Sequence, residues 1–248
     1  MRRTGQPGRR VRGHDSGSGT IGRMCGRFTQ RLSSAEVARM FDARDTVESP
    51  GERYNVAPAQ QVAAVIVRDE ERVLARLRWG MVPHWAEHPG IGSRMINARA
   101  ETVASSPAFR HSFRARRCIV PADGFYEWHR SPDGRQPFYI TSAGGAPLAF
   151  AGLWSTWRDP ATGLALLSCS ILTTTPNELM APIHDRMPVI LAPEAWDTWL
   201  DPATDPGELQ ALLRPSDADL LAYRVALLVN SVRNQGPALV APLGGVEA

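Results

Sequence analysis

The chain has 248 residues, of which 43% are hydrophobic, and it carries a formal net charge of +3 and three cysteines. That length fits one large domain or two small ones, and it is enough to bury a core. No run approaches the ~20 apolar residues that span a bilayer, and no apolar core of a secretory signal precedes Met24. The cysteines are far apart and form no CxxC pair, which argues against a disulfide framework and a zinc site. We therefore expect a cytoplasmic protein, and nothing in the sequence implies a metal or organic cofactor.

The charge is unevenly distributed along the chain. All 28 basic residues are arginine, and six of them lie in residues 1–23 beside a single acid, Asp15. From Met24 onward 22 arginines face 24 acids, a net charge of −2. Affinity for nucleic acid must then come from locally placed arginines. No lysine amine is available to form a Schiff base.

Residues 1–23 are rich in Gly, Arg and Ser and contain almost nothing to bury, so we predict a disordered leader. Three interpretations of the leader stay open. Met24 is the true start of translation, or the leader is a basic nucleic-acid-binding tail, or it is a propeptide.

The predicted elements begin after Met24. Ser33-Ser34-Ala35-Glu36 is a capping box and predicts a short helix to about Phe41. Asn55 to Pro58 is a predicted loop. Two strands joined by a turn at Asp69–Glu71 are predicted over Gln61–Val67 and Val73–Trp79.

Further along, Asn97–Ala104 is predicted as a helix, and Ser106-Pro107 as the start of another with proline at its first position. A helix is also predicted to begin at Thr175-Pro176-Asn177-Glu178. Two more are expected at Pro193–Leu200 and, capped by Asp205-Pro206, at Glu208–Leu213. Strands are predicted at Arg117–Val120, Phe138–Thr141, Leu148–Trp154, Leu164–Thr174, Pro188–Leu191 and Arg224–Val229.

Strands dominate this pattern, and no regular βαβ alternation is present. We predict one α+β domain over residues 24–242, built on a mainly antiparallel, barrel-like sheet with short peripheral helices. Residues 243–248 are expected to form a tail.

Four short segments combine polar residues in unusual contexts: 24–28 (MCGRF), 97–102 (NARAET), 124–128 (GFYEW) and 184–188 (HDRMP). Each has an ordinary interpretation on its own. A lone cysteine such as Cys25 is usually a small buried hydrophobe. Asn97 could cap a helix, Glu127 could be a half-exposed strand residue, and His184 could lie in a surface turn.

Taken together with residues 55–58 (NVAP), 79–85 (WGMVPHW) and 171–174 (ILTT), the four segments closely resemble the SOS response-associated peptidase (SRAP) family. The resemblance runs from Met24 to about Pro242, in the family's order. It implies a protein that processes abasic sites in single-stranded DNA. It also implies removal of the initiator methionine, which here leaves Cys25 with a free α-amine.

The chemistry of such a terminus can be reasoned from its groups. An abasic deoxyribose opens to an aldehyde, and an α-amine with a reference pKa of about 7.7–8.0 is partly neutral near pH 7. The amine condenses with the aldehyde to an imine, which the thiol of the same residue can attack. Closure gives a five-membered thiazolidine, favoured because one residue holds both nucleophiles.

Other roles follow from the resemblance alone. It implies that His184 is the general acid/base, that Glu127 orients the α-amine of Cys25 and takes its protons, and that Asn97 holds the amine or a sugar oxygen.

By resemblance, Pro58 and Trp79 are expected to stack on or wedge against bases. Arg27, Arg99 and Arg186 each stand two residues from a proposed catalytic residue, so on a strand they would share its face and contact phosphates. Thr173 or Thr174 is expected to bond to the DNA backbone. Core packing is the alternative for Trp79.

Three other functions stay open. Cys25, His184 and Glu127 could form a thiol peptidase that releases the segment before Cys25. The protein could instead be a non-covalent reader of modified or single-stranded DNA, or could cleave DNA as a lyase through the imine. The expected partner is single-stranded DNA containing abasic sites, and no membrane association is expected. We expect a cytoplasmic monomer that is associated with the nucleoid when it is bound to DNA.

Overall fold

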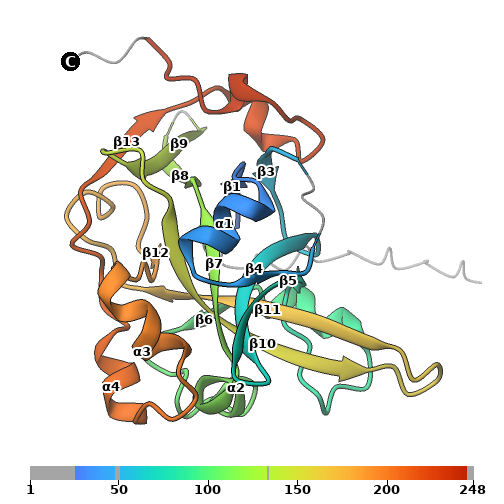
Figure 1. The fold of residues 1–248 in the computed structure, drawn as a ribbon. Helices are drawn as coiled ribbons and strands as arrows, with labels where there is room; N and C mark the ends of the chain where they lie inside the picture. Colours follow the sequence, from blue (N-terminus) through green and yellow to red (C-terminus); the bar gives the residue numbers. More distant parts are fainter. Residues whose placement is uncertain (1–25, 48–50, 133, 245–248) are drawn as a thin grey trace, which may run out of the picture.

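A computed structural model describes residues 26–47, 51–132 and 134–244. Its centre is a closed barrel of five strands (Figure 1). The strands are β4 (Gln61–Arg68), β5 (Glu71–Trp79), β7 (Arg117–Ala122), β10 (Leu148–Arg158) and β11 (Ala165–Thr174). Neighbours pair antiparallel in the order β11-β10-β7-β4-β5, and a parallel pairing of β5 with β11 closes the ring.

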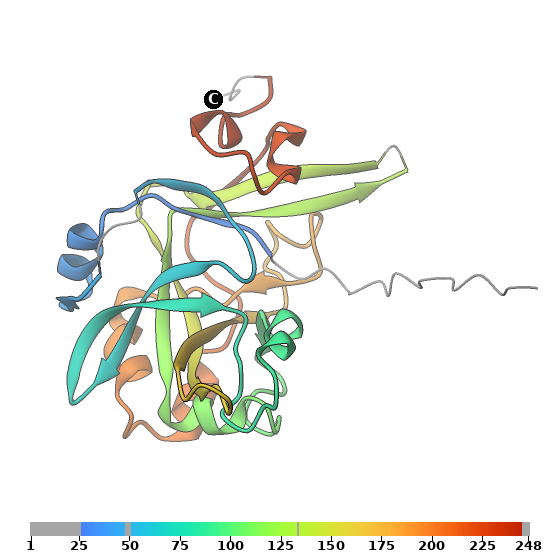
Figure 2. The ribbon, with the colours of Figure 1, turned by 90° about the vertical axis from the view of Figure 1, so that its right-hand side faces the viewer.

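A second, five-stranded sheet lies beside the barrel, in the order β13-β9-β8-β1-β3. Its members are β1 (Phe28–Gln30), β3 (Arg53–Val56), β8 (Gly124–Ser131), β9 (Gly134–Ser142) and β13 (Leu220–Arg224). Figure 2 shows the β8–β9 hairpin extending away from the barrel, with the C-terminal segment arching over it. Three short strands flank the barrel: β2 (Arg44–Asp45), β6 (Asn97–Arg99) and β12 (Met187–Pro188).

The helices are short and lie around the barrel (Figure 1). They are α1 (Ser34–Met40), α2 (Arg110–Ala115), α3 (Trp196–Leu200) and α4 (Pro206–Ala211). The 3-10 turns are η1 (Pro89–Arg94), η2 (Pro193–Ala195), η3 (Leu227–Asn230) and η4 (Pro237–Leu239). Among the described residues, no helix has the length and apolar character needed to cross a membrane.

The alternation of side chains along the barrel strands creates two apolar clusters. One contains Trp79 and Phe150 from the barrel together with Phe28 from β1, whose ring lies 5.0 Å from that of Trp79. The residues that alternate with these along the barrel strands form the second cluster together with residues of the helices, including Phe113 of α2 and Trp199 of α3. The first cluster therefore joins the barrel to the second sheet.

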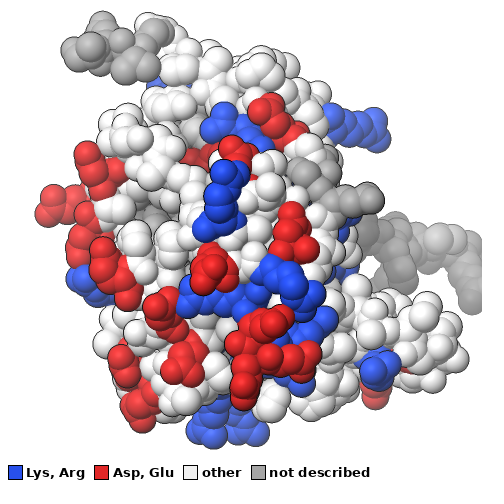
Figure 3. All heavy atoms as spheres, in the orientation of Figure 1, with Lys and Arg blue, Asp and Glu red and all other residues white. Residues whose placement is uncertain are grey.

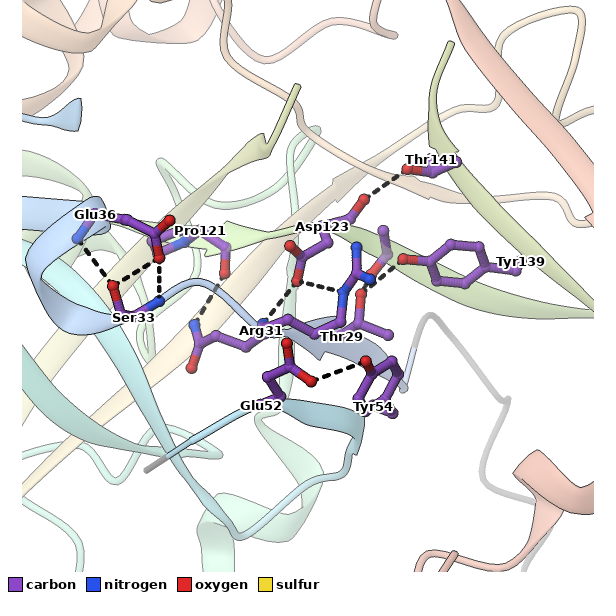
Figure 4. Close-up of polar contacts among 12 residues, drawn as sticks. Thr29, Arg31, Ser33, Glu36, Glu52, Tyr54, Pro121, Asp123, Tyr139 and Thr141 are labelled. Atoms are coloured by element: carbon purple, nitrogen blue, oxygen red, sulfur yellow. Dashed lines mark hydrogen bonds and ion pairs between the residues drawn. The ribbon is translucent and has the colours of Figure 1, made fainter. Parts of the chain in front are cut away.

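A polar network fixes β1 between β3 and β8 (Figure 4). The backbone N–H of Arg31 donates to Asp123 Oδ2 at 2.7 Å, and the Arg31 side chain lies 3.5 Å from the same oxygen. Thr29 Oγ1 and the Tyr139 hydroxyl are 2.8 Å apart. Gly124 is required beside them, because a Cβ there would lie 2.5 Å from the Tyr139 hydroxyl. The strand that follows Cys25 in sequence is thus held by β8 and β9.

The predicted α+β architecture with a mainly antiparallel barrel is confirmed. So are the capping box at Ser33 and Glu36 and the β4–β5 hairpin, whose turn places Asp69 and Glu70 at φ of 52° and 66°. Asp205 caps α4 as expected, by accepting from Gly207 N.

Several boundaries were wrong. Residues 97–104 form β6 and turns, because Asn97 to Arg99 pair in parallel with Ile171 to Thr173 of β11. The segment after Thr175 forms turns in which the Asn177 side chain accepts from Met180 N. The helix expected at Ser106-Pro107 begins only at Arg110, and the last strand ends at Arg224, where the prediction started it.

Candidate active site and DNA interface

Two acid–base groups from distant parts of the chain meet at one place. Glu127 lies on β8 and is 2% exposed, and the side chain of His184 is 13% exposed. His184 Nε2 lies 3.8 Å from Glu127 Oε2. His184 ends a run of turns and donates its backbone N–H to Met180 O at 2.9 Å. The carboxylate and the imidazole are therefore close enough to exchange a proton through a small shift or a bound group.

The other ring nitrogen of His184 is held by its own turn. The backbone N–H of Arg186 donates to His184 Nδ1 at 3.1 Å, and Asp185 Oδ1 lies 3.2 Å from the same nitrogen. When Nδ1 accepts from Arg186, the proton of a neutral ring is on Nε2, the nitrogen that faces Glu127.

Asn97 is brought to the same end of β11. It is 5% exposed and opens β6, where it pairs with Ile171. Further along β11, Thr174 pairs with Met187 of β12, directly after the His184–Arg186 turn. β11 is thus the common support of the predicted asparagine and histidine.

Arg186 forms a two-pronged ion pair. Its Nη1 lies 2.6 Å from Glu101 Oε1 and its Nη2 lies 3.0 Å from Glu101 Oε2. Nη2 also donates to the Thr173 carbonyl oxygen at 2.5 Å. These hydrogen bonds from Arg186 lower the pKa of Glu101. Both terminal nitrogens of Arg186 are thus engaged within the protein.

Arg27 is also engaged within the protein. Its Nη1 donates to Asn55 Oδ1 at 2.9 Å and to Val229 O at 2.8 Å, and its guanidinium lies 5.9 Å from the Trp128 ring. Burial lowers the pKa of Arg27. Asn55 Nδ2 donates to the carbonyl oxygens of Val229 and Ser231. Arg27 and Asn55 thus fasten the C-terminal segment over the second sheet.

Two of the residues predicted to contact DNA, Trp79 and Thr174, are buried. Trp79 is 1% exposed, packs against Phe28, and donates its indole N–H to Ile96 O at 2.8 Å, so no ring face is open to a base. Thr174 is 3% exposed and donates its hydroxyl to Leu213 O at 3.3 Å. Of the other two, Arg99 is exposed and Pro58 is half-buried.

Cys25 lies outside the described residues. The description begins at Gly26, and the Tyr126 backbone N–H donates to Arg27 O at 2.9 Å beside Glu127. The two cysteines in the described part, Cys118 and Cys169, are buried, and burial raises both thiol pKa values, that of Cys169 to about 12. Neither is suited to nucleophilic chemistry near neutral pH.

No group of three or more His, Cys, Asp or Glu side chains arranged to hold a metal ion occurs within residues 26–47, 51–132 and 134–244. Charge is mixed rather than concentrated on the face seen in Figure 3, where blue and red side chains are interspersed. This pattern agrees with the near-neutral balance from Met24 onward.

The structure thus combines a five-stranded barrel, a flanking five-stranded sheet and a buried Glu127 that faces His184. The family model of the SOS response associated peptidase (SRAP) matches residues 24–232, and the chain belongs to this family.

Named relatives span most of the chain. It is 47% identical to abasic site processing protein YoqW of Bacillus subtilis, over 88% of this chain and 99% of that protein. It is 33% identical to abasic site processing protein YedK of Escherichia coli, over 89% of this chain and 100% of that protein. A crystal structure of a protein from Bacteroides thetaiotaomicron superposes with a TM-score of 0.80 at 28% identity, covering 88% of this chain and all of that one.

Two residues with central contacts were not predicted from the sequence. Glu101 lies within the 97–102 segment, where an acid two residues after Arg99 was the available signal. Asn55 begins the 55–58 segment, which was predicted as a loop and counted toward the family resemblance, with no role given to Asn55 itself. Its three hydrogen bonds to the C-terminal segment join positions that are far apart in sequence.

Proposed function

We propose that the protein captures abasic sites in single-stranded DNA as a thiazolidine on Cys25, in a form of the chain that begins at Cys25. The observation that carries the proposal is the buried Glu127 carboxylate, which faces His184 Nε2 at 3.8 Å. Glu127 lies on β8, and its neighbour Tyr126 donates its backbone N–H to Arg27 O, two residues after Cys25 in the sequence. The names of the relatives, abasic site processing proteins, supply the substrate class.

The reaction balances without a redox partner. The α-amine adds to the C1′ aldehyde of the opened sugar, and loss of one water gives an imine. The thiol then adds across the C=N bond: sulfur bonds to carbon, and the thiol proton ends on nitrogen. His184 donates a proton to the departing hydroxyl, and Glu127 accepts one from the amine.

Asn97 completes the proposed site as a fixed amide. It is buried at the start of β6, so its orientation is set before DNA binds. A preorganised amide can hold the amine or the sugar oxygen without reorganisation during the reaction. Arg99 lies two residues later on the same strand and is exposed, which supports its proposed contact with a backbone phosphate.

The test compares two forms of the protein, one beginning at Met24 and one carrying residues 1–23. Each is mixed with single-stranded DNA containing one abasic site and analysed by denaturing electrophoresis and intact mass. We expect a heat-stable adduct from the form beginning at Met24, lost in Cys25→Ala and retained in the control Cys118→Ala. Absence of any adduct, with Cys25 confirmed as the first residue by mass, would refute the proposal and leave a non-covalent reader.

A second candidate is self-cleavage of the Met24–Cys25 bond, favoured by the family's description as a peptidase. Here Cys25, Glu127 and His184 would hydrolyse one peptide bond in their own chain. The same intact-mass measurement decides it: the longer form would lose residues 1–24 on its own, and Glu127→Ala would keep them.

A further inference from the structure

The Glu101–Arg186 ion pair is placed where it can control His184. Arg186 reaches Glu101 with both terminal nitrogens and reaches the Thr173 carbonyl with one of them. Glu101 follows β6 and Thr173 lies on β11, so these contacts tie the Arg186 side chain to the two strands that support Asn97.

The main chain of Arg186 then acts on the imidazole. Its N–H donates to His184 Nδ1 at 3.1 Å, which leaves the proton of a neutral ring on Nε2, toward Glu127. Two acceptors also lie near Nδ1 and would favour a proton there instead: the Arg186 carbonyl oxygen at 3.2 Å, and Asp185 Oδ1 at 3.2 Å on a side chain that is 89% exposed. The placement of the Arg186 main chain, whose N–H and carbonyl oxygen favour opposite tautomers, therefore decides between two arrangements of the ring proton.

We propose that Glu101 is a positioning residue: by holding the Arg186 side chain, it fixes the Arg186 N–H on His184 Nδ1 and so directs His184 Nε2–H toward Glu127. Bidentate pairs of this kind fix geometry as well as charge. The pair is also partly buried, since the Arg186 side chain is 13% exposed and the Glu101 side chain 46%. Its consequence for crosslinking rests on the proposed function.

A competing interpretation makes a different prediction. If Glu101 only occupied Arg186 until a DNA phosphate displaced it, removing the carboxylate would free the arginine and strengthen DNA binding. If Glu101 positions the turn, removing it loosens the ring and slows the reaction without improving affinity. Misplacement of a reacting group by about 1 Å can cost up to ~100-fold in rate.

The experiment uses Glu101→Gln, with Glu194→Gln as the matched control, since Glu194 is an exposed acid at the start of the 3-10 turn before α3. Two quantities are measured with abasic single-stranded DNA: the adduct-forming rate at saturating DNA, and the half-saturating DNA concentration. We expect Glu101→Gln to lower the saturating rate by roughly 10- to 100-fold and leave half-saturation within about twofold. Glu194→Gln should change neither.

Side-chain ¹⁵N NMR of His184 gives a readout that does not depend on crosslinking. We expect the wild type to carry the neutral-ring proton on Nε2, and Glu101→Gln to shift part of the population to Nδ1. An unchanged His184 spectrum, or tighter DNA binding with an unchanged or faster rate, would overturn the positioning role. If the wild type forms no adduct, the proposed function fails, and the NMR comparison still decides the role of Glu101.

Discussion

Replacing Trp79 with phenylalanine tests whether this tryptophan belongs to the core or to the DNA interface. The indole N–H donates to Ile96 O, but that carbonyl also accepts from Ile171 N at 3.0 Å, so its loss leaves one partner and costs about 1 kcal/mol. The smaller ring leaves a void on the order of 40 Å³ beside Phe28, which at about 24 cal/mol per Å³ adds about 1 kcal/mol. Lost apolar transfer energy brings the expected destabilisation to about 2–3 kcal/mol.

The measurement is urea unfolding of the wild type and Trp79→Phe, followed by fluorescence anisotropy with undamaged single-stranded DNA where both are folded. DNA affinity should stay within about twofold. Trp85→Phe is the matched control: the Trp85 side chain is 52% exposed, and its replacement should change stability by less than about 0.5 kcal/mol. Unchanged stability in Trp79→Phe together with a more than fivefold loss of affinity would refute the core assignment, since base stacking is worth about 1–3 kcal/mol.

Four further outcomes are expected. Ser33→Ala should lower the free energy of unfolding by about 1 kcal/mol in urea melts, because Ser33 caps α1; no change would contradict the cap. Cys118 and Cys169 should resist alkylation at pH 8 in the native protein and react in urea, because burial raises both thiol pKa values; native labelling counted by mass would contradict it. The pKa of Tyr139 is raised to about 12 by burial, so its neutral form stabilises the fold below pH 10. That contribution, roughly 3 kcal/mol, should be lost as the pH rises from about 10 to 12. If the urea midpoints of the wild type and of Tyr139→Phe fall by the same amount over this pH range, the contribution is not from Tyr139. Arg99→Gln should reduce the slope of log affinity against log salt for single-stranded DNA by about 0.7, and an unchanged slope would remove Arg99 from the interface.

Local signals in the sequence were sufficient where one short segment decides the structure. The capping box at Ser33 and Glu36 needs only its own four residues, and the β4–β5 hairpin needs only two alternating runs and a polar turn. The segment from Asn97 failed for the opposite reason. Its alanines, arginine and glutamate favour a helix, but parallel pairing with β11, about 75 residues away in sequence, holds residues 97–99 extended.

Within the candidate site, too, some features could be predicted from the sequence and others could not. Glu127 and His184 are 57 positions apart and no spacing rule joins them, so only the combination of motifs brought them together before the structure did. For the tryptophan in the 79–85 segment, the sequence left core packing and DNA contact both open, because a motif shows that a residue type recurs, not which way its side chain points. The register of β5 turns Trp79 into the barrel, beside Phe28.

The arginines show why residue type alone does not define a DNA interface. From Met24 onward the net charge is −2, so each arginine bonded inside the protein reduces the charge left for phosphates. Arg27 and Arg186 are both bonded internally, one to the C-terminal segment and one to Glu101, whereas Arg99 is exposed. The first two are thus held within the protein, and we propose that the third meets DNA. A site with few phosphate contacts binds undamaged DNA weakly and releases it readily. In the proposed function that weakness is useful, because the covalent bond would supply the retention that charge does not.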